Sequence, residues 1–218
     1  MTRGYQYLLF DLDGTLTDPG LGITNSVMYA LEKFGIHTED RTALYRFIGP
    51  PLTESFETFY GFTAEQSALA VTYYREYFKS RGMYENEVYN GIPALLAELK
   101  AQGKTLIVAT SKPEAFAAEI LRYFALDGYF DLVAGATMDG SRAQKADIIR
   151  YAMEAAGITE KAAALMIGDR EHDAIGAKAN GLDTLGVLYG YGSEAELRAA
   201  GAKYLAHEPK EILAFVSH

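Results

Sequence analysis

The sequence predicts an α/β fold in which a doubly wound parallel sheet carries an inserted, all-helical domain. Short apolar runs, of the kind that form strands buried on both faces, alternate with helical patterns along most of the chain. Residues 19–87 break this alternation, because they carry helical patterns alone. At 218 residues and 49% hydrophobic side chains, the chain is long enough for one large domain with a smaller insertion.

The apolar runs end at polar or glycine-containing turns, as buried strands of an α/β sheet commonly do. Between them, Pro93 stands in the first turn of a helix pattern that Gly103 ends, and Gly157 ends a second pattern. This alternation predicts parallel strand pairing. The expected strands are residues 5–10, 105–110, 132–134, 164–167 and 184–189.

The insertion separates two parts of the expected core. Two long helix patterns, residues 22–35 and 64–82, occupy it, and the stretches "FIGPP" and "YGFT" between them are typical of turns or helix breaks. We therefore expect a helical domain over residues 19–87 and an α/β core domain formed by residues 1–18 and 88–218. Most of one aromatic group is expected in the core of the insertion, with a substrate-stacking face as the alternative; it comprises Tyr73, Tyr74, Tyr77 and Phe78.

Composition limits the classes of partner. A formal net charge of −9 argues against nucleic-acid polymers, because a phosphate backbone needs a basic face. The absence of cysteine excludes disulfides and thiolate chemistry and fits cytosolic residence. No apolar run reaches the roughly 20 residues of a membrane span, and the N-terminal apolar segment is too short for a signal peptide. We expect a cytoplasmic monomer or homodimer that binds neither nucleic-acid polymers nor membranes.

Polar side chains follow several predicted strands at their carboxyl ends. These ends share one edge of a parallel sheet, so the side chains are expected to converge there. Carboxylates at such short distances repel one another unless a positive charge lies between them. Several carboxylates together favour a hard divalent cation, with Mg²⁺ as the default choice. The converging residues are Asp11, Asp13, Thr110, Ser111, Lys112, Asp169 and Asp173.

The stretch "YLLFDLDGTLTD" places two carboxylates two residues apart at the end of the first strand. Residues i and i+2 of a strand face the same side, so one of these carboxylates can coordinate and attack while the other handles protons. Gly14 permits a tight turn directly afterwards, and the hydroxyl of Thr15 could fix a carboxylate. This arrangement suits covalent phosphoryl transfer, in which a cation neutralises the phosphate.

At this point the sequence resembles a known family. The motif "DLDGT", taken with Thr110, Lys145 and "GDREHD", is similar to the haloacid dehalogenase superfamily of aspartyl-phosphate-forming phosphatases. The resemblance covers nearly the whole chain and implies a Rossmann-like core with a helical cap at residues 19–87. The stretches "TSKP" and "GDREHDAIGAKANG" look most like the phosphoglycolate phosphatase-like branch, which includes proteins similar to 5′-nucleotidases.

The resemblance implies a role for each catalytic position. Asp11 would be the nucleophile, and Asp13 would protonate the leaving oxygen and then activate the hydrolytic water. Thr110 would bind the phosphoryl group, with Ser111 beside it. Lys145 would pair with Asp11 and with the phosphoryl oxygens. The substrate would be a small phosphorylated metabolite.

The resemblance also implies a Mg²⁺ site. Asp11 and Asp169 would be ligands, and Asp13 would contact the ion through its backbone carbonyl. Asp173 would be a ligand through water or a support for the site, and Thr15 would support it as well.

Several alternatives for the activity stay open at this stage. The first choice is a phosphoglycolate phosphatase-like enzyme, with a 5′-nucleotidase or a β-phosphoglucomutase-like phosphosugar mutase as alternatives. A dehalogenase is disfavoured because the members of that group which resemble this chain lack the second aspartate, here Asp13. A phospho-acceptor receiver domain would be much shorter and would lack both the cap and that acid/base residue.

Some individual residues have a second interpretation. If Lys145 were a solvated helix lysine, Lys112 or Arg142 would take over its role in the site. Thr110 and Ser111 could instead form a helix N-cap before Pro113.

Three further features lie outside the motifs. His172 either touches substrate or is a surface histidine, and Arg46 either contacts an acidic substrate or lies at the surface. The stretch "GYGSEA", residues 190–195, matches a dinucleotide-binding pattern, but too little chain follows for such a unit, so we interpret it as a turn before a short helix.

Overall fold

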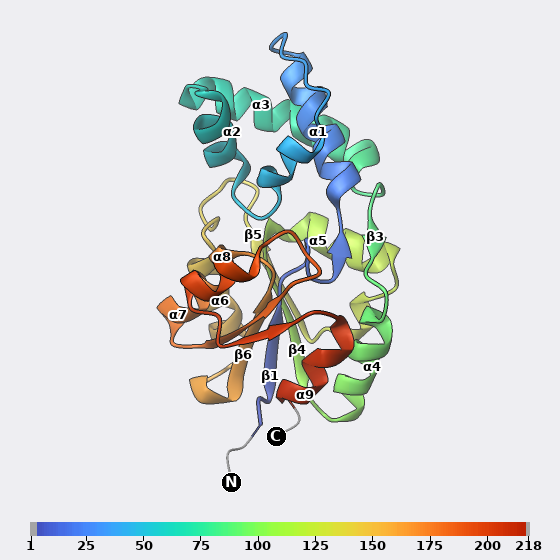
Figure 1. Ribbon diagram of the computed structural model, residues 1–218, viewed down its shortest axis with the longest axis vertical. Coiled ribbons are helices and arrows are strands. Elements are labelled where there is room, and N and C mark those ends of the chain that lie inside the picture. Colours follow the sequence, from blue (N-terminus) through green and yellow to red (C-terminus); the bar gives the residue numbers. More distant parts are fainter. Residues whose placement is uncertain (1–3, 217–218) are drawn as a thin grey trace. The chain divides into compact units, whose positions relative to one another are not determined.

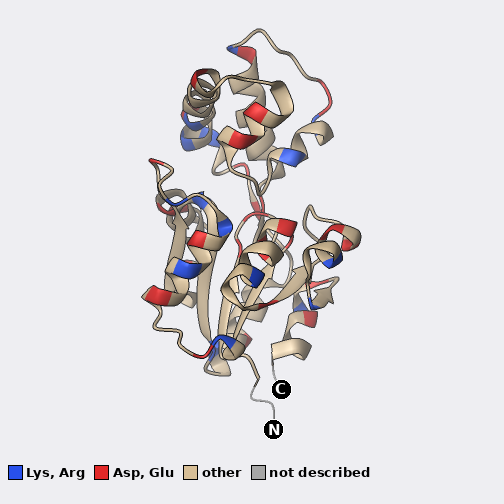
Figure 2. Ribbon diagram, turned by 90° about the vertical axis from the view of Figure 1, so that its left-hand side faces the viewer, with Lys and Arg blue, Asp and Glu red and all other residues tan. Residues whose placement is uncertain are grey.

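The computed structural model describes residues 4–216. The chain divides into two compact units, one made of Met1–Thr17 with Val88–His218 and the other of Asp18–Glu87. Figure 1 labels most of the helices and strands of both, and Figure 2 colours the charged residues along the ribbon. The short strands β2 (Thr17–Asp18) and β3 (Glu87–Val88) pair with each other where the chain passes between the units.

The first unit is built on a six-stranded sheet in the order β5-β4-β1-β6-β7-β8, in which every pair of neighbours is parallel. This confirms the predicted α/β class. The central strands consist of apolar residues because helices cover them. The strands are β1 (Tyr7–Phe10), β4 (Thr105–Pro113), β5 (Leu132–Ala136), β6 (Ala164–Gly168), β7 (Asp183–Val187) and β8 (Tyr204–Ala206).

The helices of this unit pack against the sheet. On one face, Leu9 of β1, Ile107 of β4 and Met166 of β6 form a buried cluster with residues of α6 and α7. Alternate strand residues such as Leu8 point to the other face and are equally buried. The α-helices are α4 (Ile92–Ala101), α5 (Glu114–Tyr123), α6 (Lys145–Ala155), α7 (Glu171–Asn180), α8 (Glu194–Ala200) and α9 (Ile212–Val216); the short 3-10 turns are η3 (Asp127–Tyr129), η4 (Lys161–Ala163) and η5 (Pro209–Glu211).

The structure differs from the predicted strands in several places. The edge strand β8 is not among the predicted strands, although its three residues are apolar. The strand expected over residues 184–189 ends at Val187, because its pairing with β8 ends there, so Tyr189 lies in the loop that follows. The first strand begins at Tyr7 rather than at residue 5, because its pairing with β4 begins there. The strand β4 continues beyond Thr110 to Pro113, because its pairing with β5 resumes at Pro113 after a shift in register. Thr110, Ser111 and Lys112 therefore lie in extended backbone, and only Pro113 stands at the start of α5.

The second unit is helical apart from the strand residues at its ends. Its elements are α1 (Gly20–Glu32), η1 (Thr42–Phe47), α2 (Leu52–Tyr60), α3 (Ala64–Tyr77) and the π-helical turn η2 (Phe78–Gly82). Thr63 begins α3 with a capping box, since its hydroxyl accepts from the Gln66 amide while the Gln66 side chain accepts from the Thr63 amide. The long helix pattern expected over residues 64–82 thus becomes an α-helix that ends in a π turn.

Aromatic side chains fill the core of this unit. Tyr74 and Phe78 are buried and stacked on each other, as expected for core residues. Tyr77 donates its hydroxyl to Glu85 instead, and Tyr73 packs on Phe34. Over residues 4–216, no helix combines the length and the apolar character that a membrane crossing requires.

Candidate active site

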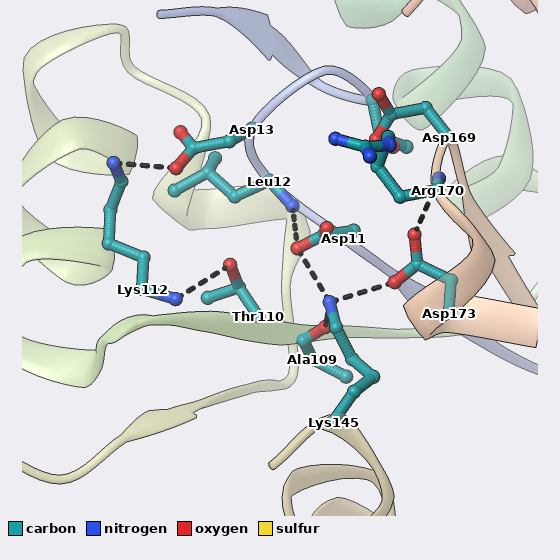
Figure 3. A network of polar contacts seen from close by, with 11 residues as sticks. Asp11, Leu12, Asp13, Ala109, Thr110, Lys112, Lys145, Asp169, Arg170 and Asp173 are labelled. Atoms are coloured by element: carbon teal, nitrogen blue, oxygen red, sulfur yellow. Dashed lines mark hydrogen bonds and ion pairs between the residues drawn. The ribbon is translucent and has the colours of Figure 1, made fainter. Parts of the chain in front are cut away.

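Lys145 lies between two carboxylates at the carboxyl edge of the sheet. Asp11 follows β1 directly, Asp173 lies in the first turn of α7, and Lys145 is the first residue of α6. Its Nζ is 3.0 Å from Asp11 Oδ1 and 2.8 Å from Asp173 Oδ1, and it donates to the Ala109 carbonyl at 3.1 Å (Figure 3). Burial lowers the pKa of Lys145, but Asp11 and Asp173 outweigh this and raise it, so the lysine is charged.

One oxygen of Asp11 is well held. Asp11 Oδ1 accepts the Leu12 amide at 2.7 Å as well as pairing with Lys145, so the carboxylate has a fixed orientation (Figure 3). Arg142 takes no part in this contact. Its guanidinium pairs with Glu114 at 3.0 Å and lies over the Tyr151 ring, so the structure brings Lys145 to Asp11 and not Arg142.

Asp13 has a lysine of its own. Lys112 Nζ lies 2.6 Å from Asp13 Oδ2, and the other oxygen, Oδ1, has no hydrogen-bond partner among the described residues (Figure 3). Burial raises the pKa of Asp13, and the charge and hydrogen bond of Lys112 oppose that shift. The orphaned oxygen is available to a proton, a water or a substrate atom.

Asp169 directly follows the strand β6 and is fully buried. Thr15 donates its hydroxyl to Asp169 Oδ1 at 3.4 Å, and the Tyr191 amide donates to Asp169 Oδ2 at 2.8 Å. Burial raises the pKa of Asp169 well above its usual range, and the charges of Asp173 and Asp11 raise it further. A bound cation would offset both causes.

The carboxylates fit a divalent cation. Asp11, Asp169 and Asp173 each offer an oxygen, and these oxygens all lie within 4.8 Å of one another. Every Asp, Glu, Lys or Arg that is buried among residues 4–216 belongs to this cluster, which holds four carboxylates and two lysines. With all four carboxylates ionised, the cluster has a formal excess of two negative charges, which matches one divalent cation, and oxygen ligands suit Mg²⁺.

Asp173 is closer to this group than the sequence suggested. Its Oδ2 accepts the Arg170 amide at 3.1 Å, which holds it at the start of α7. Burial raises the pKa of Asp173 to about 6, with Lys145 opposing the shift and Asp11 adding to it. The neighbouring His172 is half-buried, and burial lowers its pKa.

Thr110 and Ser111 do not cap a helix. The helix α5 begins at Glu114, with Pro113 as its N-cap and no side-chain cap bond, so that interpretation is wrong. The reason is the continuation of β4, which keeps both residues extended and away from the first amides of α5. Thr110 is buried, and its hydroxyl oxygen accepts the Lys112 amide at 3.2 Å.

Two features of the site were missed from the sequence. The partner of Lys112 was not foreseen, although "TSKP" places this lysine beside Thr110. The loop before α8 was interpreted only as a turn, yet Tyr191 holds Asp169. The glycines of "GYGSEA" were the one feature of the sequence that could have indicated a close backbone contact in this loop. Arg46, in the helical unit, lies over the Phe59 ring.

Comparisons with known proteins agree with this geometry. A 5′-nucleotidase of Pseudomonas aeruginosa is 51% identical over 195 residues, which cover 89% of this chain and 88% of that protein. The crystal structure of a predicted phosphatase from Clostridium acetobutylicum is 52% identical with a TM-score of 0.93, and the match covers 96% of this chain and 99% of that one.

Two other relatives differ in name. A phosphoglycolate phosphatase of Colwellia psychrerythraea is 26% identical over 216 residues, which cover 95% of each protein. The tyrosine-protein kinase PtkA of Mycobacterium tuberculosis is 40% identical over 189 residues, which cover 86% of this chain but only 63% of that protein.

The family model for haloacid dehalogenase-like hydrolases matches residues 8–187. This stretch contains Asp11 at the end of the first strand, Lys145 and Asp169, and it includes the whole helical unit. The expectation of an enzyme with this ancestry is thereby confirmed, and the chain belongs to the haloacid dehalogenase-like hydrolase family.

Proposed function

We propose that this protein is a Mg²⁺-dependent phosphatase that hydrolyses small phosphate monoesters through an aspartyl-phosphate formed on Asp11. One observation carries the proposal: the buried charged side chains of the described residues all gather around the Asp11 carboxylate. Burying so many charged groups costs free energy unless they pair with one another or bind a ligand. Membership of the hydrolase family supports the same reaction.

In the first step an oxygen of Asp11 attacks phosphorus and the bond between phosphorus and the leaving oxygen breaks. Asp13 gives its proton to that oxygen, which leaves as an alcohol. The raised pKa of Asp13, caused by burial, is appropriate for a carboxyl that must hold a proton at this moment. Thr110, Ser111 and Lys145 are the groups we assign to binding the phosphoryl oxygens.

In the second step Asp13 takes a proton from water, and the water oxygen attacks the phosphorus of the aspartyl-phosphate. Phosphate leaves, and the carboxylate of Asp11 is restored. The same group therefore acts first as acid and then as base. Lys145 keeps Asp11 oriented through both steps, because it is anchored independently on Asp173 and on the Ala109 carbonyl.

Asp11, Asp169 and Asp173 are the side chains we assign to the cation, together with the backbone carbonyl of Asp13. When bound, Mg²⁺ neutralises charge on the phosphoryl oxygens and on the carboxylate that approaches them. The buried excess of negative charge is the feature of the chain that supports this assignment.

We also propose the domain division inferred from the sequence, with residues 1–18 and 88–218 as the catalytic core and residues 19–87 as a helical cap. The compact unit Asp18–Glu87 supports it. In this scheme the cap selects the substrate, and Arg46 is one candidate for that role.

The relatives favour nucleoside 5′-monophosphates as substrates. Identity to the 5′-nucleotidase is 51%, against 26% for the phosphoglycolate phosphatase. We therefore place nucleoside monophosphates ahead of phosphoglycolate, which the sequence motifs alone had put first.

The test is a panel of phosphate esters containing nucleoside 5′-monophosphates, 2-phosphoglycolate and sugar phosphates. Phosphate release is measured with Mg²⁺, with EDTA, and after Mg²⁺ is restored. We expect nucleotides to give the highest kcat/KM, EDTA to abolish release and Mg²⁺ to restore it. Mass spectrometry of the acid-quenched enzyme should locate the phosphoryl group on Asp11. Any of three results would contradict the proposal. These are phosphate release that persists in EDTA, a phosphoryl group found on a residue other than Asp11, and isomerisation of a sugar phosphate without release of phosphate.

A further inference from the structure

The loop between β7 and α8 contains a segment, residues 189–192, that reaches the metal-site carboxylate of Asp169. The Tyr191 amide donates to Asp169 Oδ2 at 2.8 Å, while the Thr15 hydroxyl donates to Oδ1 at 3.4 Å. Two segments far apart in the sequence thus hold the two oxygens of one buried carboxylate. The carboxylate cannot turn without losing one of these bonds.

The backbone of this segment packs directly on Asp169. A Cβ built on Gly190 would lie 2.5 Å from Asp169 Oδ2 and 2.3 Å from the Gly14 carbonyl oxygen. A Cβ on Gly192 would lie 1.9 Å from the Asp169 carbonyl oxygen. Real Cβ atoms do not approach other atoms so closely, so only glycine fits at either position. The two glycines of "GYGSEA" are therefore explained by close contact with Asp169, Gly190 with its side chain and Gly192 with its backbone.

Tyr189 fastens the segment to the turn that follows β1. Its hydroxyl donates to the Thr15 carbonyl at 3.0 Å, and its ring meets the Tyr89 ring edge-to-face at 5.0 Å between centroids. The Tyr89 amide in turn donates to the Leu16 carbonyl at 3.2 Å. Tyr189 thereby fixes the position of Thr15, whose hydroxyl holds Asp169.

We propose that the 189–192 segment, anchored by Tyr189, is a positioning element that sets the orientation of Asp169 for binding the divalent cation. The inference rests on the proposed function for the cation itself and goes beyond it by giving a role to residues that are not ligands. Groups that hold a metal ligand in place typically contribute roughly 10–100-fold to metal affinity.

The test uses the full chain, freed of metal, and three variants. Tyr189→Phe removes the hydroxyl and keeps the ring, and Gly190→Ala forces a carbon against Asp169. Gly128→Ala is the matched control, because no atom lies within 4 Å of its added carbon. Titration calorimetry with Mg²⁺ and without substrate gives Kd, and circular dichroism and Tm report folding. Phosphate release is then measured across a range of Mg²⁺ concentrations.

We expect Tyr189→Phe and Gly190→Ala to raise the Kd for Mg²⁺ by roughly 10–100-fold and Gly128→Ala to leave it within about twofold. In Tyr189→Phe, the Mg²⁺ concentration for half-maximal activity should rise while kcat at saturating Mg²⁺ stays near the wild-type value. A merely structural role would lower kcat at every Mg²⁺ concentration, and that result would overturn the inference.

A folded Tyr189→Phe variant that binds Mg²⁺ with the wild-type Kd would also overturn the inference. If Gly190→Ala does not fold, the result for Tyr189→Phe is sufficient to test the inference. The two proposals fail differently. If the wild-type protein binds no Mg²⁺, both the metal part of the proposed function and this inference are wrong. If the wild-type protein binds Mg²⁺ and the Tyr189→Phe and Gly190→Ala variants bind it with the same Kd, only this inference is wrong.

Discussion

Lys112 Nζ lies 2.6 Å from Asp13 Oδ2, with both side chains almost wholly buried. The two buried lysines are thus divided between the carboxylates, since Lys145 pairs with Asp11 and Asp173 instead. This division gives the proposed nucleophile and the proposed acid/base separate cationic partners. Because the partners are separate, the protonation of Asp13 can be changed without touching the contacts of Asp11.

Lys112→Met should shift the pH dependence of the first step. Lys112 lowers the pKa of Asp13 against the effect of burial, so its removal raises that pKa further. Formation of the aspartyl-phosphate needs protonated Asp13, and kcat/KM therefore falls as the pH rises through its pKa. In the variant this falling limb should move to higher pH. The measurement is kcat/KM for a slow alkyl phosphate across the pH range with saturating Mg²⁺.

Lys178→Met, at an exposed position of α7, is the control and should keep the wild-type pH profile of kcat/KM. A falling limb unchanged in Lys112→Met would show that this lysine does not set the acidity of Asp13.

Asp11→Asn should abolish turnover while the fold is kept. The amide has nearly the shape of the carboxylate, and Lys145 retains Asp173 at 2.8 Å and the Ala109 carbonyl at 3.1 Å. An amide is not a competent nucleophile, so we expect kcat to fall by at least about 10³-fold. The readouts are steady-state phosphate release and Tm, with Asp127→Asn, an exposed aspartate, as the control. Substantial phosphatase activity in Asp11→Asn would defeat the nucleophile assignment.

Asp173 should make the metal-free protein less stable as the pH rises. Burial raises its pKa to about 6, above the unfolded value of about 3.9. The folded protein therefore binds this proton more tightly, and the resulting stability is fully present below about pH 4 and lost as the pH rises through about 6. The loss is on the order of 3 kcal/mol.

The pH effect of Asp173 is isolated by comparison with Asp173→Asn. Free energies of unfolding in urea are measured for both proteins in EDTA between pH 4 and pH 7.5. Wild type should lose stability relative to the variant across that interval, and saturating Mg²⁺ should reverse the loss because it binds the ionised carboxylates. A difference that stays constant with pH would rule out a raised pKa at this position.

Gly22→Ala should destabilise the helical unit. A Cβ on Gly22 would lie 1.9 Å from the Gly82 carbonyl oxygen, because the backbones of α1 and η2 are in contact there. We expect a loss of about 1–3 kcal/mol or more, as for other overpacked sites. Hydrogen exchange should show lost protection in peptides from α1 and η2 but not in those from β1 and β6. Gly128→Ala, which meets no neighbouring atom, should leave every peptide unchanged.

The fold was predictable because it depends on patterns that the sequence displays. Buried parallel strands appear as continuous apolar runs, and the edge rule for such sheets brings Asp11 and Asp169 together although they are far apart in the chain. The strand β8 could not be found in this way. Its three apolar residues, Tyr204 to Ala206, lie between Lys203 and His207, and a run this short cannot be told from a helix segment by its pattern alone.

The pairing of Lys112 with Asp13 was beyond the sequence, whereas the family resemblance did imply that Lys145 pairs with Asp11. Whether Lys112 or Lys145 meets a given carboxylate depends on side-chain directions at the end of β4 and the start of α6, which no spacing rule encodes. The role of residues 189–192 was missed for a similar reason. A glycine that permits a turn and a glycine that admits a neighbouring carboxylate look the same until the neighbour is known.

The position of β1 in the middle of the sheet has a consequence for synthesis of the chain. Asp11 is made early, but its strand is completed on one side by β4 and on the other by β6, which ends at Gly168. The helical unit is contiguous in the chain, whereas the cluster of carboxylates can assemble only after most of the polypeptide has been translated, because it includes Asp169 and Asp173. Nascent chains and N-terminal fragments that end before β6 are accordingly expected to contain Asp11, the proposed nucleophile, and to have no phosphatase activity.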